Sequence, residues 1–170
     1  MSETSALRHR PTARVLLFDA EGRILLMKGR LPNRPAGTSA WFTVGGGLEP
    51  GESLEVGALR EIAEETGFTE VELGPVVWLR EGVGALASGE TVLFRETYVV
   101  ARCAGGEVSR AGWEAHEIDL VDDLRWWTFD ELVATDERVY PERLLELLPD
   151  VLAGRYPAEP LVITVVRPPR

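Results

Sequence analysis

The chain has 170 residues and a mass of 18.8 kDa, with 45% hydrophobic and 27% charged residues. This composition is typical of a globular domain and excludes a disordered or fibrous chain. Lys and Arg number 18 against 28 Asp and Glu, a formal net charge of −10, which disfavours non-specific binding to nucleic acid or to anionic membranes.

Cys103 is the single cysteine, so the sequence offers no internal disulfide and no cysteine-based zinc site. No apolar run approaches the ~20 residues that span a bilayer, and the first residues lack the apolar core of a signal peptide. We therefore expect a soluble, cytoplasmic protein that has neither nucleic acid nor a membrane as its partner.

The predicted elements begin after a polar stretch: residues 1–12 are expected to be flexible and residues 13–170 to form one domain. Short apolar runs at 14–18 and 23–27, separated by the turn sequence DAEG, predict a β-hairpin. A loop rich in Pro and Gly follows over residues 29–40. It leads into a β-prone run at 41–44 and then into a glycine-rich turn.

After this turn, Ser53 is a suitable N-cap and Gly67 a suitable C-terminal glycine, so we expect a helix between them. A helical turn is predicted at residues 129–134, and a second helix begins at Pro141 and continues to residue 152 or so. Strands are predicted at residues 70–80, 91–102, 124–128 and 161–166. With no repeat and no long linker, these elements indicate one α+β or α/β domain with a mixed sheet.

The helix after the glycine turn carries an unusual concentration of carboxylates. At about 100° per residue, one side of this helix is expected to face the core; it carries Leu59, Ile62, Ala63 and Thr66. The opposite side carries Glu61, Glu64 and Glu65, with Gly57 among them, whose missing side chain would leave room for a cation. No Lys or Arg follows any of these glutamates by four residues, and like charges at this spacing repel. A solvated helix face is one interpretation, and a site for a hard cation such as Mg²⁺, which prefers oxygen ligands, is the other.

The segment from Gly46 to Phe68 resembles the signature of the Nudix hydrolases, G-x5-E-x7-R-E-U-x-E-E-x-G-U, in which U is a bulky apolar residue. The specified positions are filled by Gly46, Glu52, Arg60, Glu61, Ile62, Glu64, Glu65, Gly67 and Phe68. From average residue usage, a chance match at one starting position has a probability on the order of 10⁻⁹. One departure is Val44, which stands where many members of the family have proline.

The resemblance implies an α/β fold, the Nudix fold, which is an α/β/α sandwich around a mixed sheet. It also implies hydrolysis of the pyrophosphate bond of a nucleoside diphosphate linked to another group, with Mg²⁺ or Mn²⁺ as cofactor. The metal ligands implied by position are Glu61, Glu64, Glu65 and a backbone carbonyl at Gly45. Glu52 and Arg60 would form a supporting ion pair that fixes the turn against the helix.

Several carboxylates are candidates for the general base of such a reaction. Within the motif, Glu61 and Glu64 are candidates. Outside the motif, Glu114 and Glu117 lie in a predicted loop ahead of residues 124–128. Glu96 is a second choice, because it lies on a predicted strand where it would be partly buried and would need a partner.

Three residues outside the motif are candidates for contact with a nucleotide substrate. Trp41 is the aromatic residue nearest the glycine turn and could stack on a base, although a core tryptophan is equally compatible with its position. Arg30 and Arg34 in the Pro/Gly loop could meet a terminal phosphate, with a solvated role as the alternative. We expect a small-molecule nucleotide as the partner. A homodimer is an open alternative, because the sequence does not fix the oligomeric state.

Two other functions are compatible with a motif of this kind. A Nudix-like domain that senses a nucleotide without cleaving it usually lacks some of the motif glutamates, and this chain keeps all of them. An isopentenyl-diphosphate isomerase needs an active-site cysteine in a Cys/His-rich loop, which Cys103 on a predicted strand does not provide. Within the hydrolase interpretation, the candidate substrates are nucleoside triphosphates, ADP-ribose, dinucleoside polyphosphates and nucleotide sugars.

Overall fold

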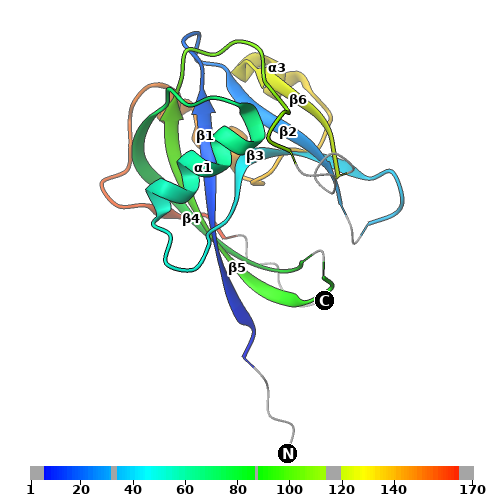
Figure 1. The fold of residues 1–170 in the computed structure, drawn as a ribbon. Coiled ribbons are helices and arrows are strands. Elements are labelled where there is room, and N and C mark those ends of the chain that lie inside the picture. The colour runs from blue at the N-terminus through cyan, green and yellow to red at the C-terminus, as the bar shows by residue number, and fades with distance from the viewer. Residues whose placement is uncertain (1–5, 32–33, 87, 114–119, 165–170) are drawn as a thin grey trace, which may run out of the picture.

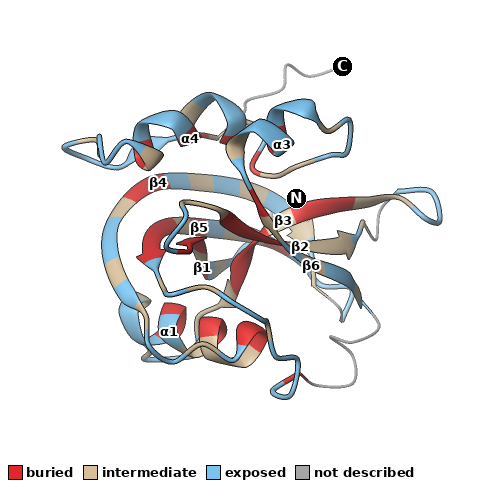
Figure 2. Ribbon diagram, turned by 90° about the horizontal axis from the view of Figure 1, so that it is seen from above, coloured by how far each residue is buried: buried red, intermediate tan, exposed pale blue. Residues whose placement is uncertain are grey.

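A seven-stranded mixed sheet forms the centre of the computed structural model, which describes residues 6–31, 34–86, 88–113 and 120–164. The strands are β1 (Arg8–Phe18), β2 (Ile24–Arg30), β3 (Ser39–Gly47), β4 (Glu72–Ala85), β5 (Thr91–Arg102), β6 (Val121–Trp127) and β7 (Leu161–Val162). They lie in the order β6-β2-β3-β1-β5-β4-β7 (Figure 1). The helices are α1 (Leu54–Thr66), α3 (Phe129–Ala134) and α4 (Leu144–Leu152). Because α1 covers one face of the sheet and α3 and α4 cover the other (Figure 2), the predicted α/β/α sandwich is confirmed.

Strand β1 runs through the centre of the sheet, and its side chains alternate between two cores. Ala13, Val15 and Leu17 pack on the α1 side, where they meet Ala58 and Ile62. The intervening side chains face α3 and α4, in a core that includes Leu16, Phe18, Trp41, Trp127, Leu132, Leu144 and Leu148. All of these side chains are buried. The two cores hold the sheet between its helical layers.

The beginning of β1 departs from the sequence-based expectation. Residues 8–12, which were expected to be flexible, form the first part of β1. They are ordered by pairing in parallel with the start of β5, from Arg8 opposite Val92 to Thr12 opposite Glu96. The Arg8 guanidinium also pairs with the Glu90 carboxylate at 2.8 Å. Short polar sequences give little local indication of a strand whose partner lies more than 80 residues away.

The predicted hairpin between residues 14–18 and 23–27 is largely absent. β1 and β2 pair only at Phe18 and Ile24, because β3 and β5 occupy the two edges of β1 over most of its length. β2 instead pairs with β3 and β6. The turn itself is present, since the Asp19 carboxylate accepts hydrogen bonds from the backbone N–H groups of Glu21 and Arg23. The chain therefore turns as predicted, but the two strands diverge into different places in the sheet.

The remaining boundaries agree with the prediction to different degrees. β5 and α3 have the predicted limits, whereas β4 continues to Ala85. α4 begins at Leu144 and not at Pro141, whose carbonyl oxygen accepts a hydrogen bond from the Leu144 N–H group at 2.9 Å in the preceding turn. β7 is limited to Leu161–Val162, and residues 165–166 of the predicted strand lie outside the described residues. Within the described part of the chain, no helix is long and apolar enough to cross a membrane.

Candidate active site

The caps of α1 place it directly after the glycine turn, as predicted. The Ser53 side chain accepts a hydrogen bond from the Val56 N–H group at 3.2 Å. At the other end, Gly67 has a φ angle of 80°, and its N–H group donates to the Ala63 carbonyl oxygen at 3.0 Å. A positive φ angle is accessible to glycine at little cost, so this residue ends the helix.

The face that α1 turns towards the sheet differs from the predicted face. Its buried residues are Gly57, Ala58, Glu61, Ile62, Glu65 and Thr66. Leu59, which was expected in the core, is 40% exposed, whereas Glu61 and Glu65 are each only 8% exposed. The prediction that all three glutamates face away from the core is therefore wrong for two of them. Glu64 is the glutamate that stays accessible, with a side chain that is 45% exposed.

The glycine turn makes this burial of carboxylates feasible. The Gly45 N–H group donates a hydrogen bond to Glu65 Oε2 at 2.9 Å. A Cβ atom added to Gly46 would lie 2.6 Å from Glu61 Oε1, so a side chain at this position would displace the carboxylate. Glu61 and Glu65 thus lie against the end of β3 because β3 presents backbone and no side chains there.

Gly57 has a different role from the one expected. The sequence indicated that its missing side chain leaves room for a cation on the acidic face. In the structure, a Cβ atom at Gly57 would instead contact Leu48 Cδ2 and would lie 3.0 Å from Glu52 Oε2. The glycine therefore allows the loop before α1 to pack on the helix.

The predicted ion pair between Glu52 and Arg60 is present and is bidentate. Arg60 Nε donates to Glu52 Oε1 at 2.7 Å and Arg60 Nη2 donates to Glu52 Oε2 at 2.9 Å. Arg60 Nη2 also donates to the Gly47 carbonyl oxygen at 3.2 Å, which ties the turn to the helix. Hydrogen bonds from Arg60 and from the Glu49 N–H group lower the pKa of Glu52 from 4.5 to about 2. The pKa of Arg60 is raised, chiefly by its hydrogen bonds to Glu52.

The third nitrogen of Arg60 joins the motif glutamates to one another. Arg60 Nη1 donates to Glu61 Oε1 at 2.9 Å and to Glu64 Oε2 at 3.1 Å. The sequence pattern did not indicate this contact, because Arg60 precedes Glu64 by four residues and Glu61 by one, whereas a basic partner was expected four residues after each glutamate. The two carboxylates therefore converge on one cationic nitrogen.

The donor set of this site fits a divalent cation in its chemistry. Among the described residues, no group of three or more Asp, Glu, His or Cys side chains is already arranged to hold a metal ion. However, Glu61 and Glu64 share a single positive charge from Arg60, and carboxylate oxygens are the ligands that Mg²⁺ prefers. The site thus stabilises positive charge at the position where the two carboxylates meet.

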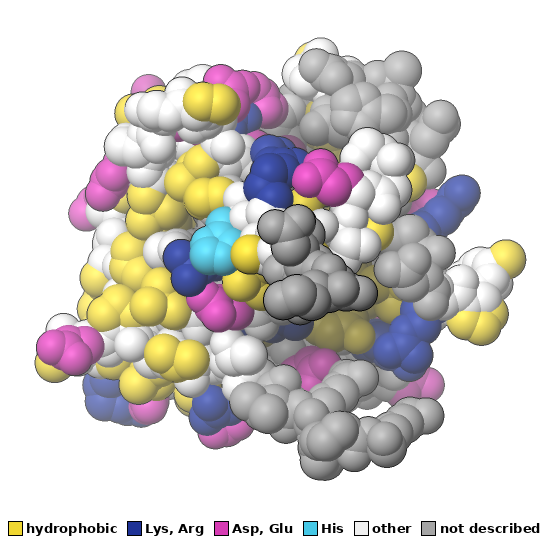
Figure 3. Space-filling view, turned by 90° about the horizontal axis from the view of Figure 1, so that it is seen from below, with side chains coloured by type: hydrophobic (Ala, Val, Ile, Leu, Met, Phe, Trp, Pro, Cys, Tyr) yellow, Lys and Arg dark blue, Asp and Glu magenta, His cyan; other side chains and the backbone are white. Residues whose placement is uncertain are grey.

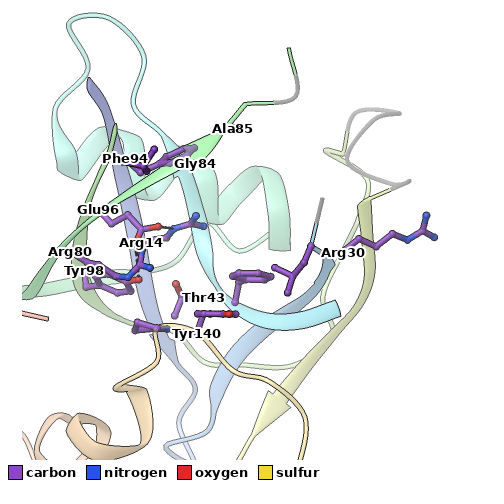
Figure 4. Close-up of a pocket in the computed structure, with 14 residues that line it drawn as sticks. Arg14, Arg30, Thr43, Arg80, Gly84, Ala85, Phe94, Glu96, Tyr98 and Tyr140 are labelled. Atoms are coloured by element: carbon purple, nitrogen blue, oxygen red, sulfur yellow. Dashed lines mark hydrogen bonds and ion pairs between the residues drawn. The ribbon is translucent and has the colours of Figure 1, made fainter. Parts of the chain in front are cut away.

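A pocket of about 390 Å³ lies on the same face of the sheet as α3 and α4, beside the part that these helices cover (Figure 4). One side is formed by aromatic rings: Phe42 and Tyr140 are stacked at a centroid distance of 5.4 Å. Tyr140 reaches this position because residues 138–140 run beside β3, with hydrogen bonds of 2.8 Å on either side of Trp41. Phe94 and Gly84 line the side formed by β5 and β4.

The floor of this pocket carries a second group of charged side chains, Arg14, Arg80 and Glu96. Arg14 Nε donates to Glu96 Oε1 at 3.1 Å and Arg80 Nη1 donates to Glu96 Oε2 at 2.8 Å. Tyr98 Oη donates to Glu96 Oε2 at 3.2 Å. Burial alone would raise the pKa of Glu96, but the two guanidinium groups outweigh it and leave the pKa below its ordinary value.

Arg14 connects this pocket to the glutamates of α1. It pairs across the sheet with Gly45, the residue whose N–H group binds Glu65. It also lines a second cavity of about 250 Å³ together with Gly45, Glu65 and Thr43. The two groups of charged residues therefore adjoin each other across β1 and β3.

The three residues predicted to contact the substrate lie in different environments. Trp41 is 2% exposed, packs edge-on against Trp127 at 5.0 Å and donates its Nε1–H to Glu137, so it is a core residue and its ring is covered. Arg30 borders the pocket, but its side chain extends away from Arg14 and Arg80 (Figure 4) and lies 3.5 Å from Asp122. Arg34 is exposed and does not line the pocket.

Of the three candidate bases outside the motif, only Glu96 lies within the described residues. Glu114 and Glu117 lie outside the described residues. Glu96 is buried and has partners, as expected, but both of its oxygens accept hydrogen bonds from arginine and its pKa is lowered. A general base functions best with a pKa near the working pH, so Glu96 is poorly suited to that role.

Sequence reasoning missed the residues that shape the pocket, namely Arg14, Phe42, Arg80 and Tyr140. One signal was available: Arg14 lies between the apolar residues Ala13 and Val15, and Arg80 directly follows an apolar run at residues 76–79. A charged residue at such a position needs a buried partner, and Glu96 on the predicted strand at 91–102 was the unpaired acid. The pairing of the three strands was needed to connect them.

Comparisons with known proteins agree with this geometry. The family model described as NUDIX domain matches residues 8–148. An RNA pyrophosphohydrolase of Caulobacter vibrioides is 48% identical over 73 residues, which are 43% of this chain and 41% of that protein. The chain thus covers less than half the length of this relative. An RNA pyrophosphohydrolase of Novosphingobium aromaticivorans is 29% identical over 153 residues, which are 85% of each chain.

A solved structure also shares the fold. An ADP-ribose pyrophosphatase of Streptococcus suis has a TM-score of 0.56 and 17% identity, over 92% of this chain and 98% of that one. The fold and the site define an α/β/α protein in which a carboxylate-bearing helix follows a glycine-rich turn. The chain belongs to the Nudix family, so the resemblance seen in its sequence is confirmed.

Proposed function

We propose that the chain is a metal-dependent hydrolase that cleaves the pyrophosphate bond of a nucleoside diphosphate linked to another group. The observation that carries this proposal is the convergence of Glu61 and Glu64 on one nitrogen of Arg60, beside a pocket with arginines in its floor. The carboxylates favour a cation and the arginines favour an anion. A nucleotide pyrophosphate with its divalent ion presents both charges.

Each motif residue has a distinct role in this proposal. Glu61, Glu64 and Glu65, with a backbone carbonyl at Gly45, would hold Mg²⁺ or Mn²⁺. When bound in such a site, a divalent ion neutralises charge on the pyrophosphate and lowers the pKa of water. Arg60 keeps two hydrogen bonds to Glu52 that do not involve Nη1, so it can release Glu61 and Glu64 without losing its hold on the turn.

The chain's own residues also supply proton transfer and orientation. Glu61 or Glu64 is the general base that takes the proton of the attacking water. The stacked pair of Phe42 and Tyr140 replaces Trp41 as the surface on which a base would lie, because both rings line the pocket and Trp41 does not. The nucleotide thus extends from the aromatic side of the pocket towards α1.

The names of the relatives raise the 5′ end of RNA as a second candidate substrate. The sequence predicted that nucleic acid is not a partner. On the described part of the face seen in Figure 3, Lys and Arg side chains are interspersed with acidic and apolar ones and form no continuous basic surface. This face therefore does not favour contacts along an RNA backbone, and an RNA would be held here at its terminal phosphates.

A hydrolysis screen tests the proposed function. The panel contains ATP, GTP, ADP-ribose, a dinucleoside polyphosphate, a nucleotide sugar and a 5′-triphosphorylated oligoribonucleotide, each with Mg²⁺ and with Mn²⁺. We expect a nucleoside monophosphate, or a 5′-monophosphorylated end, among the products. Tight binding of a nucleotide without turnover would instead support the alternative of a sensor module. Absence of both binding and turnover would reject the proposal.

A further inference from the structure

The floor of the pocket contains an arrangement that the chemistry at α1 does not require. Arg14, Glu96 and Arg80 come from the adjacent strands β1, β5 and β4, and Arg80 lies directly opposite Glu96. One carboxylate holds both guanidinium groups, Arg14 through Nε and Arg80 through Nη1. Figure 4 shows the three side chains grouped on one side of the pocket, next to Tyr98.

Most hydrogen-bond donors of these two arginines remain available. A guanidinium group has five N–H donors, and each of the two arginines uses one nitrogen on Glu96. Both side chains are partly exposed and line the pocket, so their guanidinium groups can meet a ligand there.

The charge of this group is unusual for its position. Within this directly bonded group, two guanidinium groups share one carboxylate, which leaves one excess positive charge in a protein with a net charge of −10; the Glu65 carboxylate, on the α1 side, also interacts electrostatically with Arg14. The side chains of Arg14 and Arg80 are 23% and 28% exposed, so solvent screens their charge only in part. This excess favours the binding of an anion.

A purely structural role does not account for the group. Apolar side chains can usually replace a buried ion pair without loss of stability. The same face of these strands carries Trp78, Tyr98 and Val100 where the helices cover it. The charged residues begin where the apolar core ends and the pocket opens.

We propose that Arg14 and Arg80 form an anion clamp that binds a further phosphate group of the substrate, one that lies beyond the two phosphates joined by the scissile pyrophosphate bond at α1. Glu96 is the positioning residue that aligns the two guanidinium groups. The identity of the anion rests on the proposed function. Guanidinium groups match the geometry of phosphate oxygens with parallel hydrogen bonds. Arg14 borders Gly45 and Glu65 as well as the larger pocket, so a phosphate in the clamp lies next to the carboxylates of α1.

The clamp determines which class of substrate is favoured. A nucleoside triphosphate, or a 5′-triphosphorylated end, carries a phosphate beyond the scissile pyrophosphate bond, and the clamp binds it. In ADP-ribose or a nucleotide sugar, an uncharged sugar follows the pyrophosphate and gains nothing from two arginines. We therefore expect the chain to favour triphosphates.

The test compares the full-length chain with Arg80→Gln, Arg80→Lys and the control Arg95→Gln. Arg95 is a suitable control because it precedes Glu96 on β5, points to the opposite face and forms an exposed ion pair with Glu81 at 2.9 Å. Calorimetry in buffer that contains Mg²⁺, so that the carboxylates of α1 do not repel the anion, measures the affinity for inorganic triphosphate. Steady-state kinetics measure KM and kcat for ATP and for ADP-ribose.

For Arg80→Gln, we expect the Kd for triphosphate and the KM for ATP to rise by about 10-fold or more, with kcat changed by less than about 3-fold. The KM for ADP-ribose should change by less than about 2-fold, because that substrate does not use the clamp. Arg80→Lys keeps the charge but loses the planar fork, so it should lie between the wild type and Arg80→Gln. Arg95→Gln should behave as the wild type.

Several outcomes would overturn the clamp. They are wild-type affinity for triphosphate in Arg80→Gln, equal effects on ATP and ADP-ribose, or no triphosphate binding by the wild type. If Arg80→Gln does not fold, as judged by circular dichroism, wild-type affinity in Arg80→Lys rejects the proposal and a weakened affinity supports it. A wild type that binds triphosphate through Arg80 but hydrolyses nothing in the panel would reject the hydrolase function and keep the clamp.

Discussion

The active-site region contains two groups of charged residues that adjoin each other and have opposite compositions. The helix group lies on α1 and the loop before it, and contains four carboxylates and the single guanidinium group of Arg60; the carboxylates are those of Glu52, Glu61, Glu64 and Glu65. The sheet group contains the two guanidinium groups of Arg14 and Arg80 and the single carboxylate of Glu96. In each group, one residue of the opposite charge, Arg60 or Glu96, binds several of the others.

This difference indicates that the helix and the sheet are suited to ligands of opposite charge. One residue in each group fixes the positions of the others. Arg60 donates hydrogen bonds to three carboxylates, and Glu96 accepts hydrogen bonds from two guanidinium groups. What remains on the helix is excess negative charge, suited to a cation. What remains on the sheet is excess positive charge, suited to phosphate. Arg14 lies beside Gly45 at the boundary, where the two would share one substrate.

Removal of divalent metal should have the largest effect on turnover. It tests the helix group alone. In excess EDTA we expect turnover of any substrate to fall to background, since four carboxylates without a cation repel a pyrophosphate. The melting temperature should change little, because both hydrophobic cores consist of apolar side chains. Adding Mg²⁺ or Mn²⁺ back should restore activity. Full activity in EDTA would show that the carboxylates of α1 do not hold a catalytic metal.

Glu64→Gln should have the next largest effect. We expect kcat to fall by at least about 10²-fold, because the substitution removes one of the charges that would hold the metal. The fold should be kept, since the Glu64 side chain is 45% exposed. Glu55→Gln is the matched control, an exposed glutamate in the first turn of the same helix. If Glu64→Gln keeps more than about a third of wild-type kcat, the helix group is only a solvated surface.

The two groups also differ in how far the sequence could predict them. The helix group lies within residues 52–65, so spacing along one helix was enough to bring its glutamates together, whereas the Glu52–Arg60 ion pair followed from the resemblance to the Nudix signature. The sheet group comes from positions 14, 80 and 96, and only the pairing of β1, β5 and β4 brings them together. Alternation within a strand indicates which face a residue is on, but it does not reveal its neighbour on the next strand.

The fold shows the same limit. The limits of β5 and α3 followed from the local sequence pattern, whereas the start of β1 and the partners of β2 depend on distant strands. The burial of Glu61 and Glu65 was also out of reach. A helical wheel assigns carboxylates to solvent, but here Gly46 leaves room for the Glu61 carboxylate and the Gly45 N–H group binds Glu65. In each case a tertiary contact overrode a correct local rule.

Arg60→Lys should have an intermediate effect on kcat. It tests whether Arg60 holds the carboxylates of the helix group in place. Lysine is a single point charge, and it cannot hold both oxygens of Glu52 and reach the Gly47 carbonyl oxygen at the same time. We expect kcat to fall by about 10-fold or more, as is usual for residues that orient metal ligands. Arg143→Lys is the control, because Arg143 forms an equivalent bidentate pair with Glu146 on α4. Equal kcat values for both variants and the wild type would contradict an organising role.

The smallest expected effect is on acid stability, to which both groups contribute a carboxyl with a lowered pKa. The pKa of Glu52 is lowered to about 2, and that of Glu96 also lies below its ordinary value of 4.5. Such carboxyls bind protons more weakly in the folded state than in the unfolded state, so their stabilisation is complete above the ordinary pKa and is lost as the pH falls through the folded pKa. We expect the melting temperature of the wild type to fall between about pH 5 and pH 2, and the advantage of the wild type over Glu96→Gln to narrow over that range. Thermal melts at several pH values measure both. A difference between wild type and Glu96→Gln that does not vary with pH would mean that the arginines of the sheet do not hold Glu96 in its charged form.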